Sequence, residues 1–217
     1  MTSDSRSSDN RSEPPSGLPD GVLASIEAHL RQRELRREDL YEQARRLRRL
    51  AQATMARLHT DGAAAADLEK VRRMLAELSD WLRREGRGDE PLALDALQEA
   101  VEASLLGAIV EGTPLPGPAE LSVEPEPYLL GLGDTVGEVR RLVLDRLAHD
   151  DLAGADRLLR LMERLTHALL RFDTTRAIVQ LKPKQDVART LLERTRGEVV
   201  MARFLARVRP TGDPDPR

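Results

Sequence analysis

The sequence predicts an all-α fold, an antiparallel bundle of six to seven long helices, and three observations support this prediction. Ala, Leu, Glu, Arg and Asp form much of the chain, and this mixture is typical of long helices. Aromatic residues make up only 2%, so the core must be packed by Leu, Val, Ala and Ile. No stretch alternates apolar and polar residues as a half-buried strand would.

Six segments have a helical pattern, and outside one loop after the third segment the connections between them are short, which favours a single bundle. They cover residues 20–59, 63–85, 91–110, 126–148, 151–172 and 184–208. The first can be one very long helix or two, because residues 31–39 are polar on nearly every side. Asp61 can cap the second helix, and Gly86 and Gly88 end it. A loop rich in Pro and Gly follows the third, so residues 113–126 are the best candidate for an internal boundary.

The two ends of the chain differ in composition from the segment between them. Residues 1–17 are rich in Ser, Asp, Arg and Pro, and residues 209–217 contain three prolines, so we expect two disordered tails. Residues 18–208 form the predicted single helical domain. No apolar run is long enough to span a bilayer, and the N-terminus lacks a signal-peptide core. We therefore expect a cytoplasmic protein that does not contact membranes.

Composition also restricts the chemistry. The chain has no cysteine, which excludes disulfides and thiolate metal sites. Its 34 basic and 37 acidic residues leave a net charge of −3, so binding to nucleic acid would have to use a local basic surface.

The third helical segment carries two carboxylates between apolar faces. One apolar stripe consists of Leu94, Leu97, Val101, Leu105 and Ala108, and a second consists of Leu92, Leu106 and Val110. Glu99 projects within the second stripe, and Glu102 lies about 60° from it. A carboxylate flanked by Leu and Val is costly to desolvate unless a basic partner, a shared proton or a metal ion compensates it.

The fourth helical segment repeats this arrangement with Asp134 and Glu138, which lie one turn apart. Gly131, Gly133 and Gly137 fall in the same segment, and each costs about 1 kcal/mol relative to Ala within a helix. Glycine permits the close approach of a neighbouring helix or a ligand, which would explain this cost.

Two helices that each present two carboxylates could form one four-carboxylate cluster. Such a cluster would repel itself or retain protons unless a cation neutralised it, and oxygen ligands favour Mg²⁺ or Mn²⁺. In a chain with 37 acidic residues, however, such spacings also arise by chance between solvated ion pairs. A di-iron site is disfavoured, because no histidine follows these acids at the Glu-x-x-His spacing.

Basic residues line the first helix and gather again before the last. They are Arg31, Arg33, Arg36, Arg37, Arg45, Arg46, Arg48 and Arg49, followed by a smaller cluster of Arg176, Lys182 and Lys184. They could bind a phosphate backbone, or they could pair with nearby glutamates on a solvated face. We interpret the four histidines, His59 among them, as surface or helix-end residues without partners, and Trp81 as a core residue.

Two motifs resemble the translin superfamily, in particular its translin-associated factor X (TRAX) branch. Residues 97–103, Leu-Gln-Glu-Ala-Val-Glu-Ala, resemble that branch's Leu-Gln-Glu-aromatic-Val-Glu-Ala motif, with Ala100 in place of the aromatic residue. Residues 128–138, Tyr-Leu-Leu-Gly-Leu-Gly-Asp-Thr-Val-Gly-Glu, resemble a second motif, and Arg141 falls where that segment has an arginine. The resemblance spans about residues 37–207.

This resemblance implies a translin-like fold that assembles into a hollow, barrel-like oligomer binding RNA and single-stranded DNA. It also implies an Mg²⁺-dependent endoribonuclease, with Mn²⁺ as a possible substitute. Carried over by position, the catalytic and metal-binding residues are Glu99, Glu102, Asp134 and Glu138. The candidate nucleic-acid-binding residues are Arg37, Arg45, Arg48, Arg49 and Arg141. With no partner chain in view, we expect a homo-oligomer, for which an octamer is one candidate.

Three functions therefore remain open. The leading hypothesis is a TRAX-like endoribonuclease that hydrolyses phosphodiesters at a four-carboxylate Mg²⁺ site. The alternative is a translin-like protein that binds RNA or single-stranded DNA without cleaving it. The third is a structural helical scaffold in which the carboxylates pair with Arg141 and its neighbours.

Overall fold

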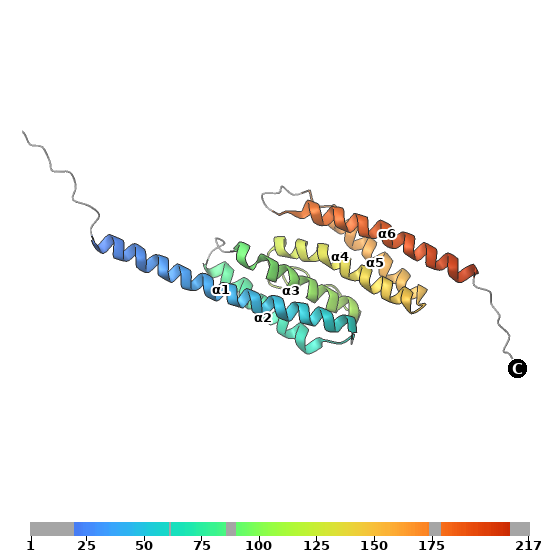
Figure 1. Cartoon of the computed structure of the whole chain (residues 1–217), viewed down its shortest axis with the longest axis horizontal. Coiled ribbons are helices and arrows are strands. Elements are labelled where there is room, and N and C mark those ends of the chain that lie inside the picture. The colour runs from blue at the N-terminus through green and yellow to red at the C-terminus, as the bar shows by residue number, and fades with distance from the viewer. Residues whose placement is uncertain (1–19, 61, 86–89, 174–178, 209–217) are drawn as a thin grey trace, which may run out of the picture. The chain divides into compact units, whose positions relative to one another are not determined.

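The computed structural model describes residues 20–60, 62–85, 90–173 and 179–208, which contain six helices and no strand (Figure 1). The helices are α1 (Asp20–Thr60), α2 (Ala65–Glu85), α3 (Glu90–Glu111), α4 (Pro125–Ala148), α5 (Leu152–Leu170) and α6 (Leu181–Val208). The all-α prediction is confirmed. The expected disordered tails, the Asp61 cap and the stop at Gly86 and Gly88 lie outside the described residues.

Helix α1 is continuous over 41 residues, which settles whether the first segment is one helix or two. The chain nevertheless divides into two compact units between Asp39 and Leu40, at the end of the polar stretch 31–39 and not in the loop 113–126. Nearly all side chains of residues 21–39 are exposed. From Leu40 onward, α1 instead buries one residue per turn, as an amphipathic helix on a core does.

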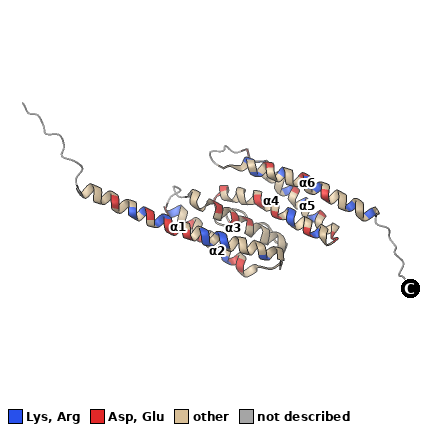
Figure 2. Ribbon diagram, viewed as in Figure 1, with Lys and Arg blue, Asp and Glu red and all other residues tan. Residues whose placement is uncertain are grey.

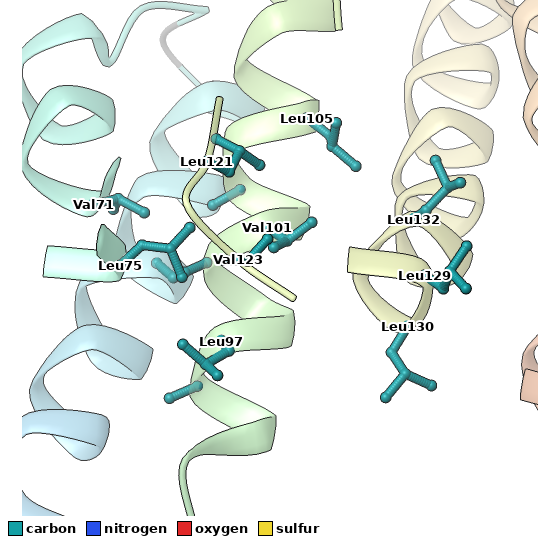
Figure 3. Packing of buried hydrophobic residues seen from close by; sticks show 14 of the residues in the cluster. Val71, Leu75, Leu97, Val101, Leu105, Leu121, Val123, Leu129, Leu130 and Leu132 are labelled. Carbon is teal, nitrogen blue, oxygen red and sulfur yellow. The ribbon is translucent and has the colours of Figure 1, made fainter. Parts of the chain in front are cut away.

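The second unit, residues 40–217, has one main core built from aliphatic residues of all six helices. Fully buried members include Leu40, Leu47, Val71, Leu75, Val101, Leu105, Val136, Val139, Met162, Leu169 and Leu181. In Figure 3, Val101 and Leu105 of α3 lie between Val71 and Leu75 of α2 and the leucines of α4. The expected core of Leu, Val and Ala is confirmed, but among the described residues Ile is not one of its buried members. Trp81, expected in the core, is half-buried and packs against it.

Helix α3 packs against both α2 and α4. Every residue from 100 to 108 is buried, so the two apolar stripes predicted on opposite sides both meet other helices. The polar Ser104 in this segment is satisfied locally, since its hydroxyl donates a 2.8 Å hydrogen bond to the Ala100 carbonyl. Any charged side chain on this stretch is therefore held inside the protein.

Helices α4, α5 and α6 pack against one another. Asp151 caps α5, because its carboxylate accepts a 2.8 Å hydrogen bond from the Gly154 amide. Gln185 of α6 donates to two carbonyls at the end of α5, Leu169 (3.0 Å) and Phe172 (2.8 Å). Helix α6 begins at Leu181, earlier than predicted, because Pro183 falls in its first turn, where a missing N–H costs nothing.

None of the helices in the described ranges is both long and apolar enough to cross a membrane.

Candidate functional site

The four predicted carboxylates lie on two helices that pack directly against each other. Glu99 and Glu102 are on α3, and Asp134 and Glu138 are on α4. Gly131 lets the two helices approach closely, since a Cβ atom there would lie 2.7 Å from the carbonyl oxygen of Gln98. The predicted reason for glycine in this helix, the approach of a neighbour, is correct at this position.

Glu102 is the most buried of the four, with 8% of its surface exposed. Its pKa is raised to about 8, first by burial and then by the negative charges of Asp134, Glu138 and Glu99 in that order, while the charge of Lys184 opposes the increase. The carboxyl group therefore keeps its proton near neutral pH. These couplings show that the four acids form one electrostatic unit, which we call the carboxylate cluster.

The Glu99 carboxylate is paired with α1. Its Oε1 atom accepts hydrogen bonds from Arg48 Nε at 2.9 Å and from Gln52 Nε2 at 3.1 Å. The Glu99 side chain is 17% exposed and that of Arg48 is 48% exposed, so the pair lies at the edge of the cluster.

The two acids of α4 also have partners from other helices. Lys184 of α6 donates from Nζ to Asp134 Oδ1 at 2.5 Å, and Gln98 of α3 donates to Asp134 Oδ2. Nε2 of His59, at the end of α1, contacts Glu138 Oε2, and the His59 side chain is only 6% exposed. The interpretation of His59 as a residue without a partner is therefore wrong.

Glu102 differs from the other three acids, because within the described part of the chain its carboxyl group has no hydrogen-bonding partner. Nor do three or more His, Asp or Glu side chains lie together there as ready metal ligands. Each of the other three acids instead contacts a donor from another helix. Arg48, Lys184 and His59 are those donors for Glu99, Asp134 and Glu138.

The chemistry of the cluster fits a hard divalent cation. Its donors are carboxylate oxygens, which suit Mg²⁺ and Mn²⁺. Four acids face three basic partners, and one of the four is buried with a raised pKa. The residues therefore fit a cation in the type and number of their donor atoms. Binding it would require the three paired acids to leave their present partners.

The four acids of the cluster were predicted from the sequence, but the side chains that contact them were not. Gln98 stands directly before Glu99 in the recognised motif, and this proximity could have identified it. Lys184 was noted only as part of a basic cluster. His59 precedes Glu138 by 79 positions, and no spacing rule connects residues that far apart.

The five candidate arginines are in different situations. Arg48 is bound to Glu99, and the Arg45 guanidinium lies 5.8 Å from the centre of the Tyr41 ring. Arg49 and Arg141 have exposed side chains, as does Arg37 in the unit that ends at Asp39. Figure 2 shows basic and acidic residues interspersed along α1. The helix therefore presents a mixed surface.

The chain is similar in sequence to one curated protein and in structure to several solved proteins. No protein-family profile matches it. An uncharacterized protein of Methanocaldococcus jannaschii, MJ0175, is 40% identical over 104 residues, which are 48% of this chain and 47% of that protein. The chain thus matches about half the length of this curated relative.

Solved structures match over most of their length. The crystal structure of AfC3PO is 31% identical and covers 85% of this chain and 98% of its own, with a TM-score of 0.76. The complex of AfC3PO with duplex RNA gives 30% identity, 87% and 100% coverage, and a TM-score of 0.77. Apo-NeC3PO, at 21% identity and a TM-score of 0.76 over 86% of this chain and 99% of its own, supports the fold alone.

Proposed function

This chain belongs to the translin superfamily, and on that basis we propose that it is a TRAX-like, metal-dependent endoribonuclease. The observation that carries the proposal is the buried Glu102, whose pKa is raised to about 8 by desolvation and by three neighbouring carboxylates. A buried acid without a partner destabilises a fold, so its presence points to a role in binding or catalysis.

RNA is the proposed substrate because a structure that shares 30% identity with this chain is a complex with duplex RNA. Phosphate backbones are held by arginine and lysine, and Arg49 and Arg141 have exposed side chains in the second unit. We assign them, with Arg37, Arg45 and Arg48, to backbone contacts. Single-stranded DNA carries the same phosphates and is the second nucleic acid to be tested.

Glu99, Glu102, Asp134 and Glu138 would hold Mg²⁺ or Mn²⁺. Such a cation supplies Lewis-acid activation of the phosphodiester and of a water molecule. The chain's own residues orient the cluster: Arg48 and Gln52 hold Glu99, while Gln98 and Lys184 hold Asp134. His59 Nε2, in contact with Glu138, can donate or accept a proton there according to its tautomer.

We also propose that the chain assembles with copies of itself. The last turns of α6 expose five large apolar side chains at helical spacing, each 55–61% exposed: Val200, Met201, Phe204, Leu205 and Val208. Exposed apolar patches of this kind mark protein interfaces. A molar mass of one chain in light scattering would contradict this assembly, and the mass of eight chains would establish the octamer.

Cleavage of labelled RNA, single-stranded and duplex, tests the enzymatic proposal. We expect cleavage with Mg²⁺, none with EDTA, and a loss of at least about a hundredfold in Asp134→Asn, because ligand substitutions cost more than those of outer partners. Asp95→Asn, an exposed acid on α3, is the matched control and should cleave normally. Cleavage that persists undiminished in Asp134→Asn would refute the assignment.

The same experiment decides the alternative, a translin-like binding protein without nuclease activity. The pairing of three cluster acids with basic or amide partners favours this alternative, because it leaves those acids neutralised without a metal. It predicts salt-dependent RNA binding with no Mg²⁺-dependent cleavage.

A further inference from the structure

Lys184 reaches the carboxylate cluster from a helix that contributes none of the four acids. It lies in the first turns of α6, and its ammonium group is 2.5 Å from Asp134 Oδ1 on α4. Its side chain is 29% exposed, so the ion pair is partly withdrawn from water. An ion pair in this position interacts more strongly than one on the open surface.

The packing of α4 against α6 is adapted to this side chain. Gly133, the residue before Asp134, faces the stem of Lys184: a Cβ atom there would lie 2.9 Å from Lys184 Cβ and 3.3 Å from its Cγ. Only glycine leaves that space without displacing the lysine. The second of the three unfavourable glycines in α4 therefore has an explanation, which is room for Lys184.

The charge of Lys184 affects more than the one carboxylate that it contacts. It lowers the pKa of Glu102, in opposition to burial and to the other three acids. A lysine two residues earlier provides a contrast. Lys182 pairs at 2.9 Å with Asp186 on its own helix, and both side chains are more than half exposed.

From these contacts we propose that Lys184 is the internal counter-ion of the carboxylate cluster, occupying Asp134 until a divalent cation displaces it. The proposal rests on the proposed function, since it assumes that the cluster binds such a cation. Two positive charges compete for the same carboxylate oxygens, so Lys184 weakens cation binding. Lys184 is thus a positioning residue that sets the affinity of the site.

Mn²⁺ binding, followed by the loss of the free-ion signal in electron paramagnetic resonance, tests this competition on the full chain. Lys184→Met keeps the aliphatic stem and removes the charge, and we expect it to bind Mn²⁺ roughly tenfold more tightly than wild type. Lys184→Gln should bind Mn²⁺ as tightly as Lys184→Met does. Agreement between the two variants would exclude a folding defect in one of them as the cause. Lys184→Arg, which retains the charge, and Lys182→Met should both bind as wild type does.

The outcomes separate this proposal from the one on which it rests. If Lys184 were merely structural, Lys184→Met would bind Mn²⁺ as tightly as wild type or more weakly. Either result would overturn the counter-ion role. The proposed cation site itself would still stand, provided that Glu102→Gln abolishes Mn²⁺ binding. If neither wild type nor any Lys184 variant binds Mn²⁺, both proposals fail. Tighter binding in Lys184→Met that disappears when Glu102→Gln is added supports both.

Discussion

Helix α4 forms two charged contacts with α6, and they differ in how completely their charges are matched. At the first, Asp134 meets Lys184 within a cluster where four acids face three basic partners. At the second, Arg140 donates to both oxygens of Glu198, at 2.6 and 2.8 Å, and to the Thr195 hydroxyl at 2.7 Å. The hydrogen bond from Arg140 to Glu198 raises the pKa of Arg140.

This difference separates a structural contact from a candidate functional one. The Arg140 pair has one cation, one anion and three aligned hydrogen bonds, so it needs no ligand. The cluster has four acids for three basic partners, and the fourth acid, Glu102, is buried without a hydrogen-bonding partner. The first should therefore contribute stability, whereas the second costs stability in the absence of a cation.

The largest expected effect on stability is the loss of the matched pair. Arg140→Met removes three hydrogen bonds that the charged guanidinium donates. It should lower the free energy of unfolding by about 3 kcal/mol, measured by urea denaturation. Mn²⁺ binding should not change. Arg196→Met is the control, because its pair with Glu163 likewise joins α6 to another helix, here α5, but its arginine is more exposed and its loss should cost less than about 1 kcal/mol. Equal losses in the two variants would remove the contrast.

Glu102→Gln should have the opposite effect, and this effect should grow as the pH rises from 4.5 to 8. Because the folded pKa, about 8, exceeds the unfolded value of 4.5, the stability that wild type gains from protonation of Glu102 is complete below pH 4.5. It is lost progressively as the pH rises from 4.5 through 8. The neutral glutamine avoids this loss, so in EDTA the variant should be about 2 kcal/mol more stable than wild type at pH 9.

At pH 5 the Glu102→Gln variant and wild type should be nearly equal in free energy of unfolding. Glu111→Gln, an exposed acid on the same helix, is the control and should change stability little at either pH. A difference between Glu102→Gln and wild type that did not grow with pH would mean that Glu102 is ionised throughout, contrary to its burial.

The smallest effects concern the glycines that bring α4 toward its neighbours. Gly131→Ala would place Cβ 2.7 Å from a backbone oxygen of α3, which cannot move aside as a side chain can, so it should cost about 1 kcal/mol or more. Gly137→Ala meets its nearest neighbour, Leu191, at an ordinary 3.9 Å and should stabilise the protein by about 1 kcal/mol. Thermal unfolding of both variants checks the signs, and a shared sign would contradict the close approach at Gly131.

The helices could be predicted well because the buried face of each one is visible in the local spacing of its apolar residues. Apolar spacing identified all six helices of the described residues, and Asp151 was predicted at the start of the fifth. The start of the sixth was placed three residues late, since Pro183 suggests a break unless it falls in a first turn. Local patterns determine where a helix lies, and less precisely where it begins.

The site was predicted only in part, for a related reason. The motifs placed four acids on two helices, and packing made those helices neighbours. The partners Arg48, His59 and Lys184 come from α1 and α6, so their contacts depend on how whole helices pack. Neither composition nor spacing records that packing. The division of the chain after Asp39, in contrast, falls at the end of the polar stretch 31–39, which the composition did mark.

The complete burial of residues 100–108 in α3 has a consequence for the motions of the site. Amide hydrogens in such a segment exchange with solvent only when much of the bundle opens. Glu102 lies within this segment, so its backbone cannot adjust to an incoming ion by fraying locally. The adjustment must come from the long side chains that reach the cluster from α1 and α6, which change rotamer in nanoseconds or faster where they are exposed. Of the three basic side chains among them only Arg48, 48% exposed, is free to exchange rapidly, so the site combines a slowly opening backbone with one fast basic partner at its edge.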